Sequence, residues 1–348
     1  MRQLRRTAGK EMKSMQVTIK DIALDTGLSI ATVSKYLNGK SILRENEQAI
    51  RASIERLHYA PNPSAQKLRS KHSKVICLLM PEVFNYFWGG FCDELEKYLQ
   101  ERGYSLLLRS YRRDDRAFAA EFSASLHGID GVIYIPTAYF ANTLGEELRS
   151  YQVPVICIDM PAAGDTLITS DNYESTRRAV AYLFARGHTN LGVLCISDQS
   201  YTMRERLRGV TDACQSHGAG MKPVHVLRTG GTTLEDADIL AMVQAPNHPT
   251  AVLSLSYNIT MQLIQLLSNC TVAVPQDFSL ISFDDDETFA AFAPPLTVIR
   301  QDQKTMAVRA GACVLAKIAQ PDTVFADVFF VPTRFIERAS VTDLKNEK

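Results

Sequence analysis

The sequence has 348 residues, of which 46% are hydrophobic, and this length exceeds what one hydrophobic core usually serves. Basic and acidic side chains balance at 38 each, but residues 1–74 hold 15 basic against 6 acidic ones, a net charge of +9 that leaves −9 on the remainder. No apolar run is long enough to cross a bilayer, and the N-terminus lacks the apolar core of a signal peptide. We therefore expect a cytoplasmic protein, not a membrane protein, with a nucleic-acid-binding end joined to an acidic body.

The seven cysteines are widely and irregularly spaced, without a CxxC pair or a Cys/His cluster. This distribution indicates buried thiols in a reducing compartment and not metal ligands, and we expect no cofactor. Residues 1–16 form a basic extension that precedes the first patterned segment, and we assign no function to it.

Residues 17–60 show the pattern of a small helical headpiece. Apolar residues recur at three- and four-residue intervals, which predicts three short helices. The first two are separated only by a tight turn at Gly27, which is the spacing of a helix-turn-helix. The predicted helices span residues 19–26, 29–37 and 45–57.

Capping residues support these helix boundaries. Thr18 is placed to cap the first helix, with Asp21 completing an approximate capping box. Ser29 is placed to cap the second helix, and Asn38-Gly39 is a common helix-ending pair.

Residues 61–74 form a basic connection between the headpiece and the body. Asn62 and Pro63 are suited to begin a helix over residues 64–69, but one and a half turns are marginal alone in water. From these residues alone, a flexible basic linker is the favoured interpretation.

From residue 75 onward, short continuous apolar runs alternate with amphipathic helical stretches. Such runs are typical of strands buried on both faces, so the body is predicted to be parallel α/β, with too many units for one small sheet. Two doubly wound lobes are expected, with a ligand bound where the carboxyl ends of their strands face each other. The predicted strands are residues 75–80, 104–108, 131–135, 153–158, 191–196, 224–227, 251–255 and 279–283. The predicted helices are residues 87–102, 173–186, 204–216, 258–267 and 303–318.

Several motifs in order along the chain resemble one family. Residues 17–23, 27–29 and 31–39 closely resemble the headpiece of the lac repressor (LacI/GalR) family, and residues 59–62 and 65–68 resemble its hinge. Further signatures of that family follow in the body, to nearly the end of the chain. They include Arg204 to Gly209, Phe283 to Asp285, Pro295 to Gln301 and Arg338 to Ser340.

This resemblance implies a helix-turn-helix headpiece and a two-lobed periplasmic-binding-protein type I body of parallel doubly wound sheets. The chain is expected to cross between the lobes near Met160, Gln301 and Phe325. Lobe 1 then comprises about residues 75–160 and 301–325, and lobe 2 about residues 161–300 and 326–342. The implied function is a sequence-specific transcriptional repressor that binds a palindromic operator as a homodimer and is controlled by a small-molecule effector.

The resemblance also implies which residues contact DNA. The second helix enters the major groove, where Ile30 and Ala31 offer apolar contacts and Lys35 can donate to guanine. In the hinge, Leu68 stands where the family wedges a leucine between base steps in the minor groove. Contacts that fix the register are expected from Thr18, Ser29, Thr32, Ser34, Asn38, Asn62, Ala65 and Arg69, although Thr18 and Ser29 also have capping roles.

Two residues of the body align with effector-binding positions of the family. The guanidinium of Arg206 and the carboxylate of Asp284 form a clamp typical for a polyol. Asp171 is a weaker candidate, and we favour a helix N-cap for it. Further lining is expected from Phe84, Asn85, Tyr86, Phe87, Thr202 and Ser256. Since many relatives carry asparagine where this chain has Ser256, the effector class stays open among sugars, sugar acids and nucleosides.

Alternatives to this interpretation were considered. The acidic run from Asp284 to Glu287 is similar to a pair of catalytic carboxylates or a metal cluster, but adjacent side chains diverge at a strand end and no histidine is near in sequence. A charged turn explains the run better, and His188 is expected to secure a helix-to-strand junction, so we do not expect an enzyme. A periplasmic sugar-binding receptor shares the body but lacks the headpiece, and a headpiece without an operator role is the other alternative.

Overall fold

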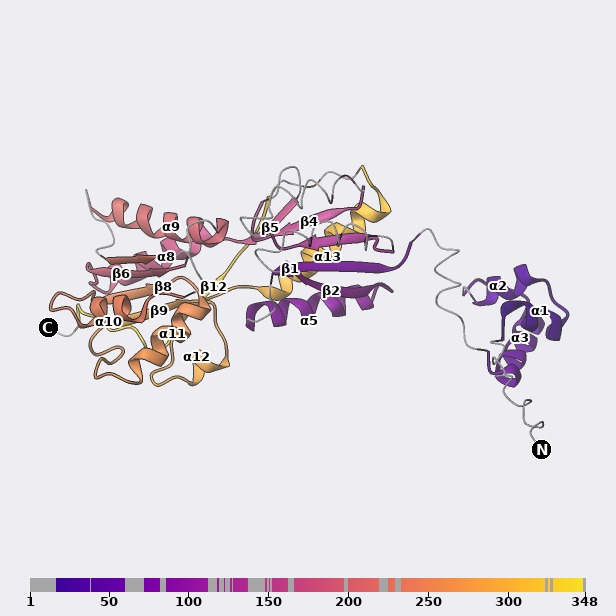
Figure 1. Ribbon diagram of the computed structural model, residues 1–348, viewed down its shortest axis with the longest axis horizontal. Helices are drawn as coiled ribbons and strands as arrows, with labels where there is room; N and C mark the ends of the chain where they lie inside the picture. The colour runs from indigo at the N-terminus through magenta and orange to yellow at the C-terminus, as the bar shows by residue number, and fades with distance from the viewer. Residues whose placement is uncertain are drawn as a thin grey trace, which may run out of the picture. The chain divides into compact units, whose positions relative to one another are not determined.

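The computed structural model describes residues 17–37, 39–59, 72–81, 86–111, 128–136, 152–161, 166–196, 200–218, 225–228, 233–322 and 328–346, with isolated positions between them. Every structural statement below refers to these residues. The chain divides into two compact units, residues 1–71 and residues 72–348, which are described separately (Figure 1).

The first unit is a three-helix domain, as predicted from the sequence. Its helices are α1 (Ile19–Thr26), α2 (Ile30–Leu37) and α3 (Arg44–Leu57). Gly27 ends α1 in the left-handed conformation, with φ of 67°, which explains why glycine is needed at this turn. All three helices contribute to one core, whose buried residues are Ile22, Ala23, Val33 and Ile50.

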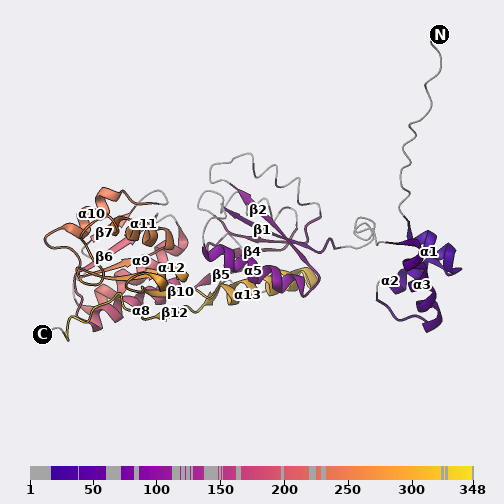
Figure 2. The same cartoon turned by 90° about the horizontal axis from the view of Figure 1, so that it is seen from below.

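The second unit contains two sheets. In the first lobe, parallel strands are ordered β11-β5-β4-β3-β1-β2. The helices α5 (Tyr86–Gln100) and α13 (Gln303–Ala319) lie together along one face of this sheet (Figure 2). The strands are β1 (Val75–Pro81), β2 (Ser105–Tyr111), β3 (Gly131–Tyr134), β4 (Val155–Ile158), β5 (Thr166–Ser170) and β11 (Val328–Val331).

The second lobe has the strand order β12-β10-β9-β8-β6-β7, and only β12 is antiparallel to its neighbour. Its strands are β6 (Leu191–Cys195), β7 (His225–Arg228), β8 (Ala251–Ser254), β9 (Ser279–Phe283), β10 (Thr297–Arg300) and β12 (Arg334–Ile336). Helices α8 (Asn172–Ala185) and α9 (Tyr201–His217) cover one face. Helices α10 (Asp236–Gln244), α11 (Tyr257–Leu267) and α12 (Glu287–Ala291) cover the other.

Alternation along each strand explains why each sheet is buried on both faces. In β1, Ile76 and Leu78 pack against α5 and α13, whereas Cys77 and Leu79 point to the opposite core. Successive side chains of a strand point to opposite faces, so a continuous apolar run supplies both cores at once. The α/β fold expected for the body is therefore confirmed.

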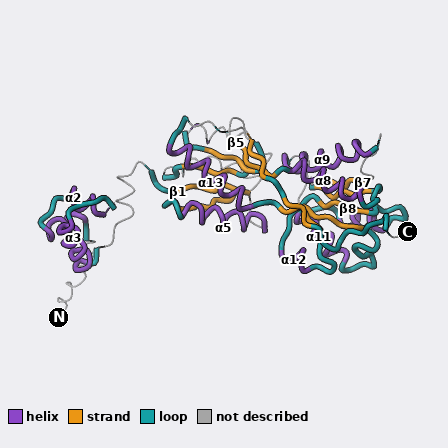
Figure 3. The backbone as a smooth tube through the Cα atoms, turned by 180° about the vertical axis from the view of Figure 1, so that it is seen from behind, coloured by secondary structure: helices purple, strands orange, loops and turns teal. Residues whose placement is uncertain are grey.

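Two of the expected lobe crossings are wrong. Both β5 and β11 belong to the first sheet, so the chain leaves lobe 1 after Ser170 and not near Met160. It returns after β10, at Gln301, and leaves again after Val331 and not near Phe325. Figure 3 shows β5 in the same lobe as β1 and α13.

The physical reason is that β5 and β11 are short and pair with each other at one side of the sheet. Strands of four or five residues at a lobe junction carry too little apolar pattern to be recognised in isolation. The elements β10, β12, α10 and α12 were also not among the predicted ones. Among the described helices, none has the length and apolar character needed to cross a membrane.

Candidate DNA interface and effector site

The helix α2 presents an outward face. Ile30 is 42% exposed, and Ala31 and Lys35 are exposed beside it, whereas Val33 on the opposite side is fully buried. Tyr36 packs against the core and helps to fix the helix. The three residues expected to face base edges therefore share one solvent-exposed side of α2.

Two of the polar candidates in the headpiece act as helix caps. The backbone N–H and the hydroxyl of Thr18 both donate to the Asp21 carboxylate at 2.7 Å. These hydrogen bonds, the side-chain one first, hold the pKa of Asp21 below its ordinary value. The hydroxyl oxygen of Ser29 accepts from the Thr32 N–H at 3.1 Å. Ser34 is partly buried on α2.

Several predicted DNA-binding residues lie outside the described residues. These are Asn38 at the end of α2 and the four hinge positions Asn62, Ala65, Leu68 and Arg69. Their roles stay predictions from the family resemblance.

The body brings Arg206 to the edge of the second sheet. Arg206 lies in α9 with 4% of its surface exposed, and its Nε donates to the Asn172 Oδ1 at 2.7 Å. Its Nη1 donates to the carbonyl of Leu255 at 2.8 Å. Burial lowers the pKa of Arg206, and the nearby carboxylates of Asp284 and Asp159 oppose this effect. A buried, pre-oriented guanidinium with donors left over is suited to bind a polar ligand.

A glycine explains how α9 approaches α8 so closely. A Cβ at Gly209 would lie only 2.2 Å from the carbonyl oxygen of Tyr173, so no larger residue fits there without movement. Arg206 lies one turn before Gly209 on α9, and its carbonyl accepts a hydrogen bond from the Thr176 hydroxyl of α8 at 2.8 Å. This close packing places Arg206 against Asn172.

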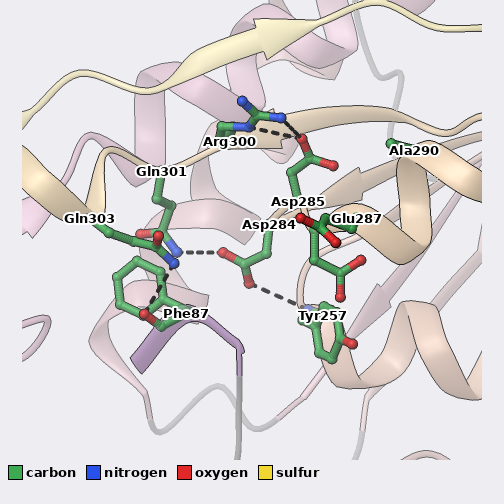
Figure 4. A pocket seen from close by; sticks show the side chains of 10 residues that line it. Phe87, Tyr257, Asp284, Asp285, Glu287, Ala290, Arg300, Gln301 and Gln303 are labelled. Atoms are coloured by element: carbon green, nitrogen blue, oxygen red, sulfur yellow. Dashed lines mark hydrogen bonds and ion pairs between the residues drawn. The ribbon is translucent and has the colours of Figure 1, made fainter. Parts of the chain in front are cut away.

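Asp284 follows β9 and points toward the same region. Its φ of 76° is unusual for a residue with a side chain and is a form of local strain that often occurs at functional sites. The Nε2 of Gln301 donates to the Asp284 Oδ1 at 2.5 Å, and the Tyr257 N–H donates to Oδ2 at 3.4 Å (Figure 4).

The acids that follow Asp284 have other partners. Asp285 pairs with Arg300 and with Arg338, and Asp286 caps α12 by accepting from the Phe289 N–H at 3.0 Å. Burial raises the pKa of Asp285, but the hydrogen bonds from the two arginines outweigh it and lower the value overall. The divergent roles match a charged turn and not a pair of convergent carboxylates.

Asp159 was missed by the sequence analysis. It follows β4 with φ of 60°, and its Oδ1 accepts from the Thr169 hydroxyl at 2.9 Å. Burial raises its pKa to about 6, Arg206 opposes the rise, and Asp284 adds to it. A lone acid directly after a buried apolar strand was the signal available, since parallel strand ends border the cleft.

A cavity of about 350 Å³ lies where the two lobes meet (Figure 4). Phe87 and Gln303 line it from the first lobe, and Tyr257 and Asp284 line it from the second. Phe87 is 6% exposed and also packs into the hydrophobic core of the first lobe, so its role as lining of the effector site stays a prediction. Of the predicted aromatic segment, Phe84 and Asn85 lie outside the described residues, as does the side chain of Tyr86.

The weaker candidates differ in their surroundings. Ser256 is 7% exposed at the start of α11, and its buried hydroxyl has no hydrogen-bond partner among the described residues. The Thr202 hydroxyl lies 2.9 Å from that of Ser200. Asp171 accepts from the Glu174 N–H at 3.1 Å, so the expected N-cap is confirmed. His188 bonds to the carbonyl of Thr342 at 3.0 Å, which confirms its expected place at a structural junction.

Comparisons with known proteins agree with this architecture. A family model described as bacterial regulatory proteins, lacI family, matches residues 18–62, and one described as a periplasmic binding protein-like domain matches residues 180–341. The HTH-type transcriptional regulator DegA of Bacillus subtilis (strain 168) is 27% identical over 84% of this chain and 88% of its own. The HTH-type transcriptional repressor PurR of Yersinia enterocolitica is 28% identical over 94% of this chain and 97% of its own.

Among solved structures, the crystal structure of the lac repressor dimer bound to operator and the anti-inducer ONPF has a TM-score of 0.78. It is 21% identical and covers 94% of this chain and 99% of that chain, which shows a shared fold.

A helix-turn-helix unit followed by a two-lobed periplasmic-binding-protein-like body defines a class of DNA-binding transcriptional regulators with an effector-binding body. The relatives found across the chain are themselves regulators of that class. Within it, this chain combines a DNA-binding domain that matches the lacI family of bacterial regulatory proteins with a periplasmic-binding-protein-like domain.

Proposed function

We propose that this regulator is a homodimeric repressor that binds an inverted-repeat operator and is controlled by a neutral polyhydroxylated effector. The observation that carries the proposal is the carboxylate of Asp284 in the wall of a cavity between two lobes, with the buried guanidinium of Arg206 close enough to interact with it electrostatically. A ligand in such a cavity changes DNA binding only through its differential affinity for two lobe arrangements.

On the DNA side, the exposed face of α2 supports direct readout. Ile30 and Ala31 are proposed to contact thymine methyl groups, and Lys35 to donate to guanine. Leu68 is proposed to form the wedge at the operator centre. Because Thr18 and Ser29 are engaged in caps, any phosphate contact they make is additional to a structural role.

The charges around the cleft favour an uncharged effector. Asp159 and Asp284 flank the single guanidinium of Arg206, and Glu287 adds an exposed carboxylate to the rim of the cavity. Arg300, which lines the cavity, is paired with Asp285. A carboxylated or phosphorylated ligand would lie among more negative than positive charges, so we propose a sugar or a nucleoside and not a sugar acid.

The hydroxyl pattern of such a ligand suits the groups present. Asp284 and Asp159 accept hydrogen bonds, Arg206 donates, and the unpartnered hydroxyl of Ser256 can do either. Phe87 supplies an apolar face. A polyol has both donors and acceptors and an apolar ring face, so it can satisfy all of these groups together.

The proposed dimer uses the exposed edge of the first sheet. β2 is the last strand of that sheet, and Leu107 and Leu108 on it are 39% and 41% exposed. An apolar edge strand is a ready template for pairing with another chain. A second copy of this chain would cover both leucines and place two headpieces on one operator.

The proposal is tested by gel shift of the purified protein on DNA from upstream of its own gene, with a thermal-shift screen of sugars, sugar acids and nucleosides. We expect salt-dependent binding to one site, and stabilisation by an uncharged ligand that also changes the gel shift. Absence of specific DNA binding would contradict the repressor function. Stabilisation chiefly by sugar acids would contradict the effector class.

A further inference from the structure

One buried glutamine bonds both lobes of the body at the same time. Gln301 lies at the crossing after β10 and is 8% exposed. Its Oε1 accepts from the Ser170 hydroxyl of the first sheet at 2.6 Å, and its Nε2 donates to the Asp284 Oδ1 of the second sheet at 2.5 Å. Ser170 is the last residue of β5, so the bond also joins two of the crossings between the lobes.

These bonds continue to the other candidate effector residue. Asn172 donates through Nδ2 to the Ser170 carbonyl at 2.8 Å and accepts through Oδ1 from the Arg206 Nε at 2.7 Å. A continuous polar chain therefore runs from Arg206 through Asn172, Ser170 and Gln301 to Asp284. Both ends of this polar chain are groups proposed to bind the effector, and its middle residues, Ser170 and Gln301, lie at crossings between the two lobes.

The distances make this arrangement sensitive to the angle between the lobes. A hydrogen bond at 2.6 Å is lost once the donor and acceptor separate beyond about 3.5 Å, so a relative displacement of Ser170 and Asp284 by about 1 Å breaks one side. The amide of Gln301 is buried, so an unpaired donor or acceptor is unfavourable there. A lobe arrangement that moves Ser170 away from Asp284 by that distance would therefore break the polar chain.

We propose that Gln301 is a positioning residue that holds the Asp284 carboxylate for the effector. Through Gln301, binding of the effector is coupled to the crossings between the two lobes. This proposal rests on the effector control proposed above and names the residue through which that control acts. In the effector-free protein, Gln301 fixes the Asp284 rotamer through Oδ1, while Oδ2 accepts only a long bond of 3.4 Å from the Tyr257 N–H and has capacity left for the ligand. Without the Gln301 amide, the Asp284 carboxylate loses its hydrogen bond, and Ser170 and residue 301 at the two crossings are no longer bonded to each other.

The chain contains a matched control within one lobe. Gln262 of α11 donates through Nε2 to the Leu234 carbonyl at 2.7 Å, and its Oε1 accepts from the Leu234 N–H at 3.1 Å. It also bonds Asp236 at 2.6 Å. Gln262 thus joins two segments through a similar set of bonds, but both belong to the second lobe.

The test is hydrogen exchange on the effector-free, full-length protein. The backbone amides to follow are those of Asp171, bonded to the Val331 carbonyl at two of the crossings, and Asp284, bonded to the Ile299 carbonyl beside the residue that Gln301 holds. We expect Gln301→Met to accelerate exchange at both amides about tenfold, while Gln262→Met leaves them unchanged. Wild-type exchange in Gln301→Met, or equal acceleration in both variants, overturns the proposal.

A compensating double variant separates positioning from simple loss of stability. Gln301→Glu alone places a carboxylate against Asp284 and should accelerate exchange as Gln301→Met does. Adding Asp284→Asn restores a donor opposite the carboxylate, and the Ser170 hydroxyl still donates to it, so protection should return. Failure of the second substitution to restore protection overturns the proposal.

A DNA-binding measurement connects the positioning to regulation. Gln301→Met should shift the affinity of the effector-free protein for DNA from upstream of its own gene by about fivefold or more, because the balance of lobe arrangements changes. Unchanged affinity overturns the coupling. If wild type binds no DNA, the proposed function fails, while the exchange measurements still decide whether Gln301 joins the lobes.

Discussion

The guanidinium carbon of Arg206 lies 3.5 Å from the centre of the Phe283 ring, and Phe283 directly precedes Asp284 in the chain. The contact is a cation–π interaction in a site largely shielded from water, where such contacts are strongest. It connects α9 to the end of β9. The Phe283 ring therefore helps to hold the Arg206 guanidinium near Asp284, the next residue in the chain.

Substitution of Arg206 should separate effector binding from DNA binding. We expect Arg206→Lys to fold and bind operator DNA normally, but to lose about 1.5 to 3 kcal/mol of effector affinity, because an ammonium cannot reproduce the planar fork that bonds Asn172 and Leu255. Effector-dependent melting and gel shift on the same preparation measure this. Arg177→Lys, on the exposed face of α8, is the control and should behave as wild type. A normal effector response in Arg206→Lys would remove Arg206 from the site.

The carboxyl of Asp159 should make stability depend on pH. Its pKa, raised by burial from 3.8 to about 6, means that the folded protein binds the proton more tightly than the unfolded one. The stability contributed by the protonated form is present below pH 3.8 and is lost as the pH rises through about 6. Relative to wild type, Asp159→Asn should therefore gain up to about 3 kcal/mol between pH 4 and pH 7. Melting curves across that range check this, and a constant difference would contradict it.

The ion pairs of Asp285 with two arginines should make stability depend on pH in the opposite direction. The Asp285 side chain is fully buried and bonds Arg300 and Arg338, which hold its pKa low despite burial. Its stabilising contribution is present at neutral pH and is lost as the pH falls through the lowered pKa. Asp285→Asn should lower the free energy of unfolding by about 3 to 5 kcal/mol at pH 7 and by less in acid. Chemical denaturation at both pH values measures the difference, and an equal loss in acid would argue against charge pairing as its source.

Lys35 should contribute to base preference as well as affinity. Lys35→Ala is expected to weaken specific operator binding by about 1 to 3 kcal/mol and to relax the preference at one base pair of each half-site. Selection of bound sequences from a randomised half-site measures the preference. Lys97→Ala, an exposed lysine on α5 in the body, is the control. An unchanged sequence preference in Lys35→Ala would place Lys35 on phosphates and not on bases.

The dimer should depend on one edge of the first sheet. Leu108→Asp is expected to convert the protein to monomers at micromolar concentration, because a carboxylate on the exposed strand β2 opposes burial against a second copy. Phe330→Asp is the matched control, since Phe330 is 58% exposed on β11 at the other edge of the same sheet. Light scattering distinguishes the two, and a dimer that persists in Leu108→Asp would place the interface elsewhere.

Much of the fold was predictable because its causes are local in the chain. The capping pair Thr18 and Asp21 and the left-handed Gly27 define the first helix within ten residues, and continuous apolar runs such as residues 75–80 indicate strands buried on both faces. The resemblance to a family placed Arg206 and Asp284 in one site, and in the structure the two side chains are close enough to interact electrostatically, with Asp284 lining the cavity. How each contributes to effector binding stays a prediction.

What only the tertiary structure decided involves partners far apart in sequence. Ser170 and Gln301 are separated by 131 residues, and no local pattern reveals that they meet. The same holds for Asp159 after β4 of the first sheet, which interacts with Arg206 on a helix of the second lobe, and for β11, which is defined as a strand by pairing with β5. Periodicity reports which face of an element is buried, but the choice of neighbour depends on packing and hydrogen bonds formed only after the whole sheet has assembled.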